Sequence, residues 1–298
     1  MKQEGHDRTK AKQPARRGAK AFQDNVVVVS GASSGIGKEM ALQLAEQGAI
    51  LSLAARSIEG LERAAAQCRK SGAEVLCVQT DVAQEGQCEN LIARTVERYG
   101  RIDTLINNAG LGLRGNFSDY ENLSLLRIVM DTNFFGMAYP TFYALPHLKK
   151  TKGRIVAMSS IIGKIAIPGE SSYCAGKFAV AGFFDSLRME LADCGVSVTV
   201  VYPGYVVTEF SERSLKANGE PHGSQGRRLY TRNMMSAEEC AGRIIKAAAK
   251  RKRDVFAGLK EKIALWVNLA FPRLSDRLVS RHIRSKDKRL DSDSGGDM

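Results

Sequence analysis

The chain of 298 residues is 44% hydrophobic and 26% charged, a balance typical of a soluble globular protein. Its apolar runs are too short to span a bilayer, its N-terminus lacks the apolar stretch of a secretory signal, and its six cysteines lack metal-ligand spacing. These features favour a cytoplasmic protein with reduced thiols and no metal site. The formal net charge of +12 is concentrated at residues 1–20 and 243–289, so the body between them is nearly neutral.

Short β-branched runs alternate with helical stretches along the chain from Asn25 onward. We expect strands at residues 26–30, 50–54, 74–78, 102–107, 154–159 and 196–202, with a last short strand at 254–257. Helical stretches separate most of them, which implies crossover connections, a parallel sheet and helices on both of its faces. The sequence therefore predicts a single-domain α/β fold with a doubly wound, Rossmann-type parallel sheet in a three-layer α/β/α arrangement.

Other parts of the chain depart from this alternation. One long helical region is expected from the fourth strand through about Lys149, whereas residues 205–235 lack apolar periodicity and are expected to form a long loop. The predicted boundaries are 1–22 for a disordered basic tail, 23–257 for a dinucleotide-binding catalytic domain, 258–285 for amphipathic basic helices and 286–298 for a second disordered tail.

A glycine-rich turn, Ser30-Gly31-Ala32-Ser33-Ser34-Gly35-Ile36-Gly37, follows the first strand and leads into a helix. Glycines let the backbone approach a ligand closely, and the first N–H groups of the helix face an anion. The turn is therefore a candidate cradle for the pyrophosphate of a dinucleotide. A tight structural turn without a ligand is the alternative, because such spacing also occurs by chance.

The residues that follow the next three strands indicate which dinucleotide binds. Arg56 follows the second strand, where an acidic residue would bind the ribose hydroxyls of NAD and an arginine would bind the 2′-phosphate of NADP. Asp81 follows the third strand and is placed to bond an adenine. The small residues of Asn107-Asn108-Ala109-Gly110 end the fourth strand and leave room for a flat ring. The pattern favours NADP(H) over NAD(H).

Tyr173 and Lys177 lie four residues apart and so share one face of a predicted helix. An ammonium group beside a phenol stabilises the phenolate and lowers its pKa, which makes the pair a candidate for proton transfer. Ser159 and Ser160 end the fifth strand, where one of the two hydroxyls could donate to a substrate carbonyl. Asn133 lies within a predicted helix, where asparagine is mildly unfavourable and suggests a local distortion or a held water.

Together these motifs resemble the short-chain dehydrogenase/reductase family, in its single-domain branch, from about Asn25 to Val255. The resemblance implies hydride transfer between a nicotinamide and a substrate. The catalytic residues that it implies are Asn133, Ser160, Tyr173 and Lys177. The coenzyme-binding residues that it implies are Gly31, Ser33, Ser34, Gly35, Ile36, Gly37, Arg56, Ser57, Asp81, Val82, Asn108, Ala109, Gly110, Tyr173, Lys177, Pro203, Gly204, Val206 and Thr208.

Two features depart from the family pattern. Gly176 stands where the family often has serine, and we expect it to permit close helix packing. Ser33 and Ser34 stand in the part of the glycine turn where some NADP(H)-preferring members carry a basic residue. Because no basic residue stands in the turn, the preference for NADP(H) depends on Arg56 alone.

These features predict an NADP(H)-dependent carbonyl reductase or alcohol dehydrogenase. Apolar residues in the loops at 111–122, 161–170 and 205–235 suggest a lipid-like, steroid-like or xenobiotic-like substrate. A catalytically silent, nucleotide-sensing protein on the same fold is the alternative. Nucleic-acid binding by the basic ends is disfavoured, because no aromatic stacking platform or zinc spacing accompanies them. We expect a homodimer or a homotetramer.

The basic C-terminal region carries a stripe of apolar residues at helical spacing. The stripe consists of Leu259, Ile263, Trp266, Val267 and Ala270. Pro272 is expected to end the first helix, and a second stripe with Leu274 and Leu278 follows among arginines. Such helices could lie in a membrane surface or pack against the protein's own core or a partner subunit, because amphipathicity fits all of these.

Overall fold

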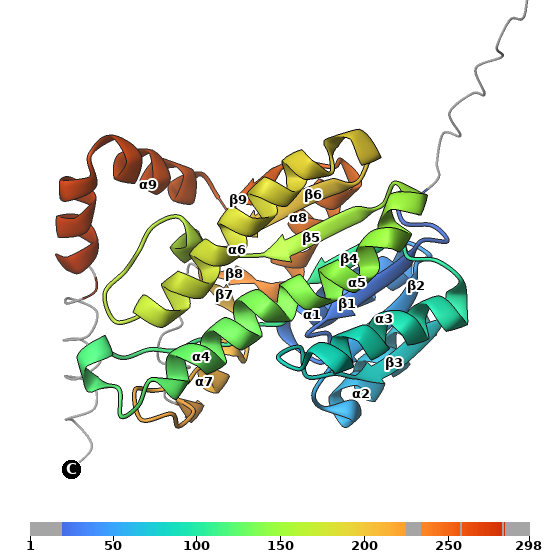
Figure 1. Ribbon diagram of the computed structural model, residues 1–298, viewed down its shortest axis with the longest axis horizontal. Helices are drawn as coiled ribbons and strands as arrows, with labels where there is room; N and C mark the ends of the chain where they lie inside the picture. Colours follow the sequence, from blue (N-terminus) through green and yellow to red (C-terminus); the bar gives the residue numbers. More distant parts are fainter. Residues whose placement is uncertain (1–19, 225–233, 257, 282, 284–298) are drawn as a thin grey trace, which may run out of the picture.

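The computed structural model describes residues 20–224, 234–256, 258–281 and 283, and seven strands within them form one parallel sheet (Figure 1). The strand order is β3-β2-β1-β4-β5-β6-β9. The strands are β1 (Val26–Ser30), β2 (Ile50–Ala55), β3 (Val75–Gln79), β4 (Thr104–Asn107), β5 (Arg154–Met158), β6 (Ser197–Tyr202) and β9 (Asp254–Phe256). Each agrees with a predicted strand to within two residues.

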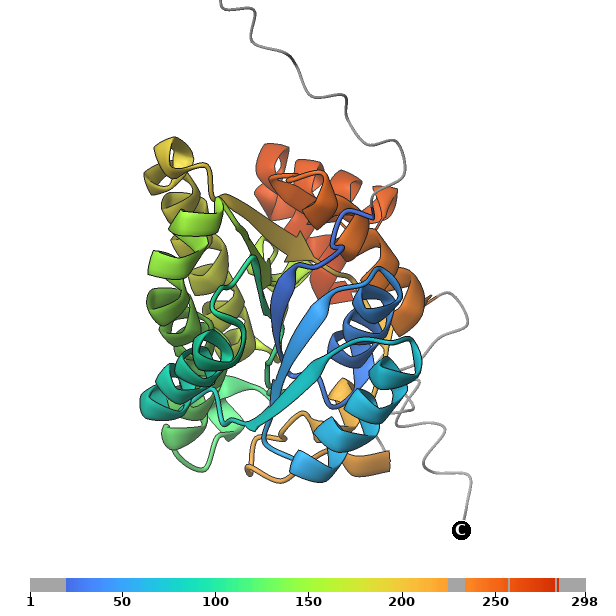
Figure 2. The ribbon, with the colours of Figure 1, turned by 90° about the vertical axis from the view of Figure 1, so that its right-hand side faces the viewer.

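Helices cover both faces of the sheet, as Figure 2 shows. On one face α1 packs between α2 and α8, and on the other α5 packs on α3 while α6 packs on α4. The helices are α1 (Gly35–Glu46), α2 (Ile58–Lys70), α3 (Glu85–Tyr99), α4 (Ser124–Met130), α5 (Gly136–Thr151), α6 (Ser171–Glu190), α7 (Phe210–Arg213), α8 (Ala237–Ala249) and α9 (Leu259–Ala270). The predicted three-layer, doubly wound α/β fold is confirmed.

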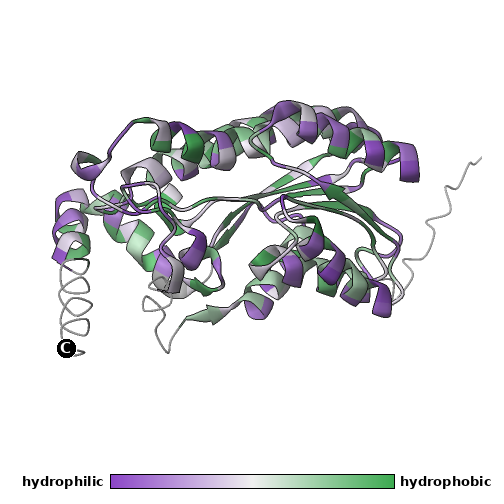
Figure 3. Cartoon of the chain, turned by 90° about the horizontal axis from the view of Figure 1, so that it is seen from below, coloured by the Kyte–Doolittle hydropathy of each residue, from purple (hydrophilic) through white to green (hydrophobic). Residues whose placement is uncertain are grey.

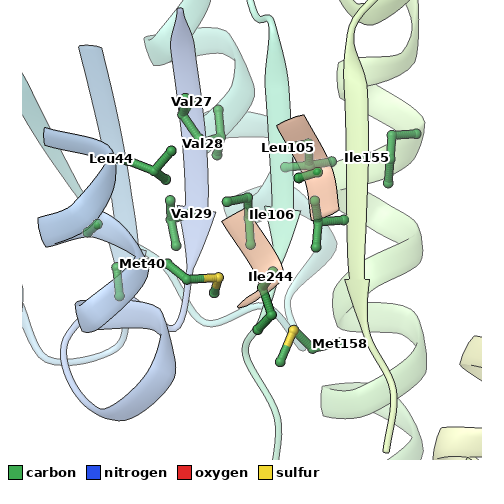
Figure 4. Packing of buried hydrophobic residues seen from close by; sticks show 14 of the residues in the cluster. Val27, Val28, Val29, Met40, Leu44, Leu105, Ile106, Ile155, Met158 and Ile244 are labelled. Carbon is green, nitrogen blue, oxygen red and sulfur yellow. The ribbon is translucent and has the colours of Figure 1, made fainter. Parts of the chain in front are cut away.

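The core lies between the sheet and its two helix layers (Figures 3 and 4). Val27, Val28 and Val29 of β1 are all fully buried, because a central parallel strand is covered on both faces. Met40 and Leu44 of α1 pack in the same cluster. The continuous apolar run of β1 therefore reflects its place in the middle of the sheet.

The strand order also positions the candidate site. The chain crosses from β1 to β2 on one side and reaches β4 on the other side of β1, so the ends of β1 and β4 flank a topological switch point. Ligands bind at this crevice in open parallel sheets. The glycine turn follows β1, and the segment from Asn108 to Gly110 follows β4.

The region after β4 differs from the single long helix that the sequence predicts. Residues 108–123 contain an isolated bridge at Leu113 and a short 3₁₀ turn, and the helix begins at Ser124. Gly115 in this stretch has φ of +151°, a conformation that interrupts a helix and favours glycine. A π-helical turn at Asp131–Phe135 then separates α4 from α5, and the expected distortion at Asn133 is confirmed.

The segment that the sequence predicts as a long loop contains two short elements. Strand β7 (Val206–Val207) pairs with β8 (Met235–Ser236), and α7 lies between them in the sequence. Residues 225–233 lie outside the described part, as do most of the two predicted tails. Phe22, which the prediction assigned to the N-terminal tail, is 1% exposed, so the folded part begins slightly earlier than residue 23.

Candidate active site

The glycine turn is packed tightly against the end of β4. Gly31 has φ of +66°, and a Cβ there would lie 2.9 Å from the Cα of Ala109. A Cβ on Gly37 would clash with the carbonyl oxygen of Gly31. Side chains are therefore excluded at both positions by the packing of the turn itself, which requires glycine there.

Asn108 joins the ends of the two central strands. Its Nδ2 donates to the carbonyl oxygens of Ser30 and Gly31 at 3.0 and 3.2 Å. The Ser30 hydroxyl oxygen in turn accepts from the backbone N–H groups of Asn108 and Ala109 at 3.0 and 3.1 Å. Asn108 therefore shapes the crevice through the backbone, with its amide nitrogen already bonded.

The predicted adenosine-binding residues lie at the ends of β2 and β3. Arg56 is exposed, and Ser57 caps α2 by accepting from the N–H of Gly60 at 3.0 Å. Asp81 accepts from the N–H of Ala83 at 3.1 Å, and Val82 is buried. These side chains occupy the same carboxyl edge of the sheet as the glycine turn, so the fold brings the predicted adenosine residues together.

Ser159 and Ser160 directly follow β5 and lie in two different environments. The Ser159 hydroxyl donates to the carbonyl oxygen of Lys177 at 2.9 Å, so Ser159 links β5 to α6. The Ser160 hydroxyl accepts from the N–H of Ile162 at 3.3 Å and donates to the carbonyl oxygen of Pro203 at 3.5 Å. It also lies close enough to the Tyr173 phenol to lower the pKa of that group. Of the two serines, Ser160 is therefore the one that faces the tyrosine.

Tyr173 and Lys177 point from one face of α6 into the protein and are 8% and 3% exposed. The Nζ of Lys177 donates to the carbonyl oxygen of Met158 at 2.8 Å and lies 5.6 Å from the centre of the Tyr173 ring. Burial lowers the pKa of Lys177 to about 7. Burial disfavours an ammonium group because the charge loses its hydration.

The expectation that Lys177 lowers the pKa of Tyr173 is wrong for this structure. Burial is the largest influence and raises the pKa of the phenol, and the nearby carboxylate of Glu170 raises it further. The hydrogen bond from Ser160 and the charge of Arg114 oppose these effects without overcoming them. The physical reason is that the phenol and the amine are both desolvated, so neither charged form is favoured.

Asn133 and Gly176 meet where the π-helical turn approaches α6. The Asn133 side chain bonds both the N–H and the carbonyl oxygen of Leu111 at 2.8 Å and is fully buried. A Cβ on Gly176 would lie 3.3 Å from the Cβ of Asn133, so the expected close packing at Gly176 is confirmed. Asn133 Oδ1 and Lys177 Nζ both approach Gly110. Asn133, Lys177 and the end of β4 are thus neighbours.

The segment after β6 closes over the glycine turn. The Pro203 carbonyl oxygen accepts from the N–H of Ile161 at 3.0 Å, which ties this segment to the end of β5. A Cβ built on Gly35 would lie 3.2 Å from the Cβ of Thr208, so Thr208 covers the start of α1. A Cβ on Gly204 would meet Glu261 of α9 at 2.7 Å.

Comparison with known proteins identifies this arrangement. A family model described as short chain dehydrogenase matches residues 25–219. The chain belongs to the short-chain dehydrogenase/reductase family. It is accordingly an oxidoreductase of the kind that acts on CH–OH groups. The resemblance inferred from the motifs is confirmed.

Curated relatives of the family are similar over most of their length, and two examples illustrate this. An Arabidopsis thaliana protein named 11-beta-hydroxysteroid dehydrogenase-like 4A is 36% identical over 87% of this chain and 84% of its own. A Rattus norvegicus protein named dehydrogenase/reductase SDR family member 7B is 37% identical over 93% of this chain and 87% of its own.

Solved structures of the family share the fold. An alcohol dehydrogenase from Thermococcus sibiricus, complexed with 5-hydroxy-NADP, matches with a TM-score of 0.69 and 26% identity over 78% of this chain and 96% of its own. Levodione reductase matches with a TM-score of 0.71 and 28% identity over 79% of this chain and 96% of its own.

Two contacts near the family's site were not predicted from the sequence. Arg114 and Glu170 form an ion pair at 3.0 Å, and both side chains are largely buried. Arg213 of α7 donates to the hydroxyl oxygen of Ser34 at 2.7 Å, across 179 residues of sequence. No local pattern marks these residues, because the partners of each contact come from different segments of the fold.

Proposed function

We propose that the protein transfers a hydride between NADP(H) and a carbonyl or secondary alcohol of an apolar substrate. The observation that carries the proposal is the meeting of Ser160, Tyr173 and Lys177 in one buried cluster at the carboxyl edge of the sheet. Gly110, at the end of β4, borders the same cluster. Family membership supports the reaction class.

The proposed chemistry assigns one role to each side chain. The hydroxyls of Ser160 and Tyr173 bind the oxygen of the substrate, and Tyr173 gives it a proton in the reductive direction. The nicotinamide supplies or accepts the hydride. Asn133 holds the π-helical turn against Leu111 and keeps a proton path open beside Lys177.

The role proposed for Lys177 depends on the charge of its amine. Its amine donates to the carbonyl oxygen of Met158, and burial lowers its pKa to about 7. We infer that additional hydrogen-bond acceptors from ribose hydroxyls favour the ammonium form in the complex. The ammonium then stabilises the Tyr173 phenolate, so the lowering of the tyrosine pKa depends on the bound coenzyme.

NADP(H) is proposed over NAD(H) because of the end of β2. Ala55 stands where an acid would bind the ribose, and the exposed guanidinium of Arg56 follows it. Titration of the protein with NADPH and NADH tests this preference. We expect Arg56→Ala to weaken NADPH binding by about tenfold and to leave NADH binding unchanged. Equal losses for both coenzymes would contradict the role of Arg56.

A steroid-like substrate is proposed from the apolar side chains around Tyr173. Ile162 and Cys174 pack with the tyrosine, and the ring of Phe210 lies 5.9 Å from its ring. The names of several relatives refer to hydroxysteroids, which supports this class. A panel of steroid, fatty and small xenobiotic ketones, followed by NADPH absorbance, tests it. Turnover of polar ketones alone would overturn the assignment.

The C-terminal helices expose their apolar side chains. Ile263, Trp266 and Leu269 of α9 are 55%, 71% and 64% exposed. A second helical segment at 272–281 begins at Pro272 and carries three arginines among exposed leucines. Within the described residues, no helix has both the length and the hydrophobicity needed to cross a bilayer.

We propose that this region, residues 258–285, lies on the cytoplasmic surface of a membrane. The exposed apolar side chains are flanked by basic ones, which complements anionic lipid. Flotation with phosphatidylserine-containing vesicles tests this, and the double variant Trp266→Ser, Leu269→Ser should lose the vesicle association. Retained flotation in the double variant would contradict the proposal.

A homodimer is proposed through α5 and α6. Phe142 of α5 and Phe178 and Phe183 of α6 are 71%, 43% and 37% exposed. Aromatic residues are enriched at protein interfaces, which makes this face a candidate for subunit contact. Light scattering after gel filtration measures the oligomeric state. We expect Phe142→Glu to shift the dimer toward the monomer. A monomeric unmodified chain would contradict the proposal.

A further inference from the structure

Arg213 reaches from the segment beside the substrate to the start of the coenzyme turn. Its Nη2 donates to the Ser34 hydroxyl oxygen at 2.7 Å, and Ser34 is the N-cap residue of α1. The Ser34 side chain makes no capping bond to the helix. The guanidinium, which is 53% exposed, is therefore held beside the amino end of a twelve-residue helix.

Neighbouring residues make this position suitable for a phosphate. Thr208 covers Gly35 at the first turn of α1, and the N–H groups and dipole at the start of a helix favour an anion. On the other side, a Cβ on Gly60 would lie 2.9 Å from the Cβ of Ser33, so Ser33 contacts the first turn of α2. Ser34 thus contacts Arg213, and Ser33 contacts α2, the helix that follows Arg56.

We propose that Arg213 is a second coenzyme-binding cation, supplied by the segment 203–224, that binds a phosphate group of the dinucleotide. The inference rests on the proposed function. A planar guanidinium with several donors is well suited to phosphate oxygens. Arg213 also supplies the positive charge that the Ser33-Ser34 pair lacks within the turn.

The carboxylate of Glu209 is the present ionic partner of Arg213. The two groups are 3.9 Å apart, and the Glu209 carboxylate also lies 3.9 Å from the Cβ position of Gly35. Both side chains are more than half exposed, so their pairing is weak. A phosphate can therefore replace Glu209 as the partner of Arg213 with little loss.

The chain after Arg213 connects this cation to the substrate side of the crevice. Leu215 accepts from the N–H of Arg114 and donates to the carbonyl oxygen of Gly112, both at 2.9 Å. Arg114 pairs with Glu170 at the start of the helix that carries Tyr173. Binding of a phosphate by Arg213 therefore fixes a segment that borders the proton-transfer group.

Equilibrium titration of the full chain with NADPH and with NADH, followed by coenzyme fluorescence, tests the proposal. We expect Arg213→Gln to raise the Kd by about five- to tenfold and Arg213→Lys to raise it less. Equal weakening of both coenzymes assigns Arg213 to the pyrophosphate, and weakening of NADPH alone assigns it to the 2′-phosphate. Glu209→Gln is expected to lower the Kd by about two- to threefold, because a negative charge is removed.

Arg98→Gln is the matched control. Arg98 is also a half-exposed arginine paired with a glutamate, Glu74, but the pair lies at the amino end of the strands, away from the glycine turn. The substitution should therefore leave both Kd values unchanged. If Arg213→Gln binds both coenzymes as tightly as the unmodified protein, the inference is overturned. The proposed function still stands in that case, provided that NADPH binding depends on Arg56. Failure of the unmodified protein to bind either coenzyme overturns the proposed function itself.

Discussion

The side chain of Asn133 bonds both backbone polar groups of Leu111, each at 2.8 Å. This double contact holds the π-helical turn against the segment that follows β4. Because Asn133 is fully buried, its removal leaves groups on Leu111 without these partners. Asn133 therefore stabilises the site before any catalytic role is considered.

We expect Asn133→Ala to lower the free energy of unfolding by about 2 to 3 kcal/mol, through the unsatisfied groups of Leu111. Asn133→Asp keeps an acceptor for the Leu111 N–H but sets a buried carboxylate oxygen against the Leu111 carbonyl oxygen, so it should not restore the stability. Urea denaturation measures both variants. An alanine variant as stable as the unmodified protein would show that the contact with Leu111 contributes nothing.

The two serines at the end of β5 provide a matched pair of variants. Ser160→Ala should lower kcat by about a hundredfold or more, because its hydroxyl meets Tyr173. Ser159→Ala removes a bond to the Lys177 carbonyl and should lower the free energy of unfolding by about 1 kcal/mol. Steady-state kinetics and urea denaturation separate the two effects. A large loss of kcat in Ser159→Ala, with little change in Ser160→Ala, would show that the two serines have the opposite roles.

The buried amine of Lys177 predicts how stability depends on pH. Its pKa is about 7 in the folded protein and about 10.5 ordinarily, so between these values the unfolded chain binds a proton that the folded one lacks. Stability therefore rises with pH in this window, by at most about 1.4 kcal/mol per pH unit from this group. Below pH 7 both states are protonated and the burial penalty is fully present.

Comparison with Lys177→Met isolates that contribution. Buried thiols such as Cys88 have raised pKa values and lower the stability as pH rises, so the difference between the two proteins is the quantity to measure. Urea denaturation of coenzyme-free protein at pH 7, 8 and 9 should show the unmodified protein gaining relative to the variant. Parallel pH profiles would contradict the low pKa of Lys177.

The sequence was sufficient to predict the sheet but not the contacts between distant segments. Val26 to Val29 indicate a buried parallel strand because all four are β-branched and apolar. Strands β7 and β8 were missed because two residues show no periodicity. The bond between Arg213 and Ser34 depends on how the segment after β6 folds back, which no local pattern encodes.

The residues of the candidate site could be predicted better than their chemistry. Spacing placed Tyr173 and Lys177 on one helix face, and the structure agrees. Spacing does not report burial, and burial raises the pKa of the phenol here. The direction of that shift could be found only once the surroundings of both side chains were known.

The central claim is that the Tyr173 hydroxyl carries the proton in a reaction with NADPH. Tyr173→Phe removes that hydroxyl and little else. Its kcat for reduction of a substrate ketone, measured beside its Kd for NADPH, tests the claim most directly. We predict a loss of kcat of at least about a thousandfold with a Kd within about twofold of the unmodified protein. Undiminished turnover by Tyr173→Phe would contradict the claim.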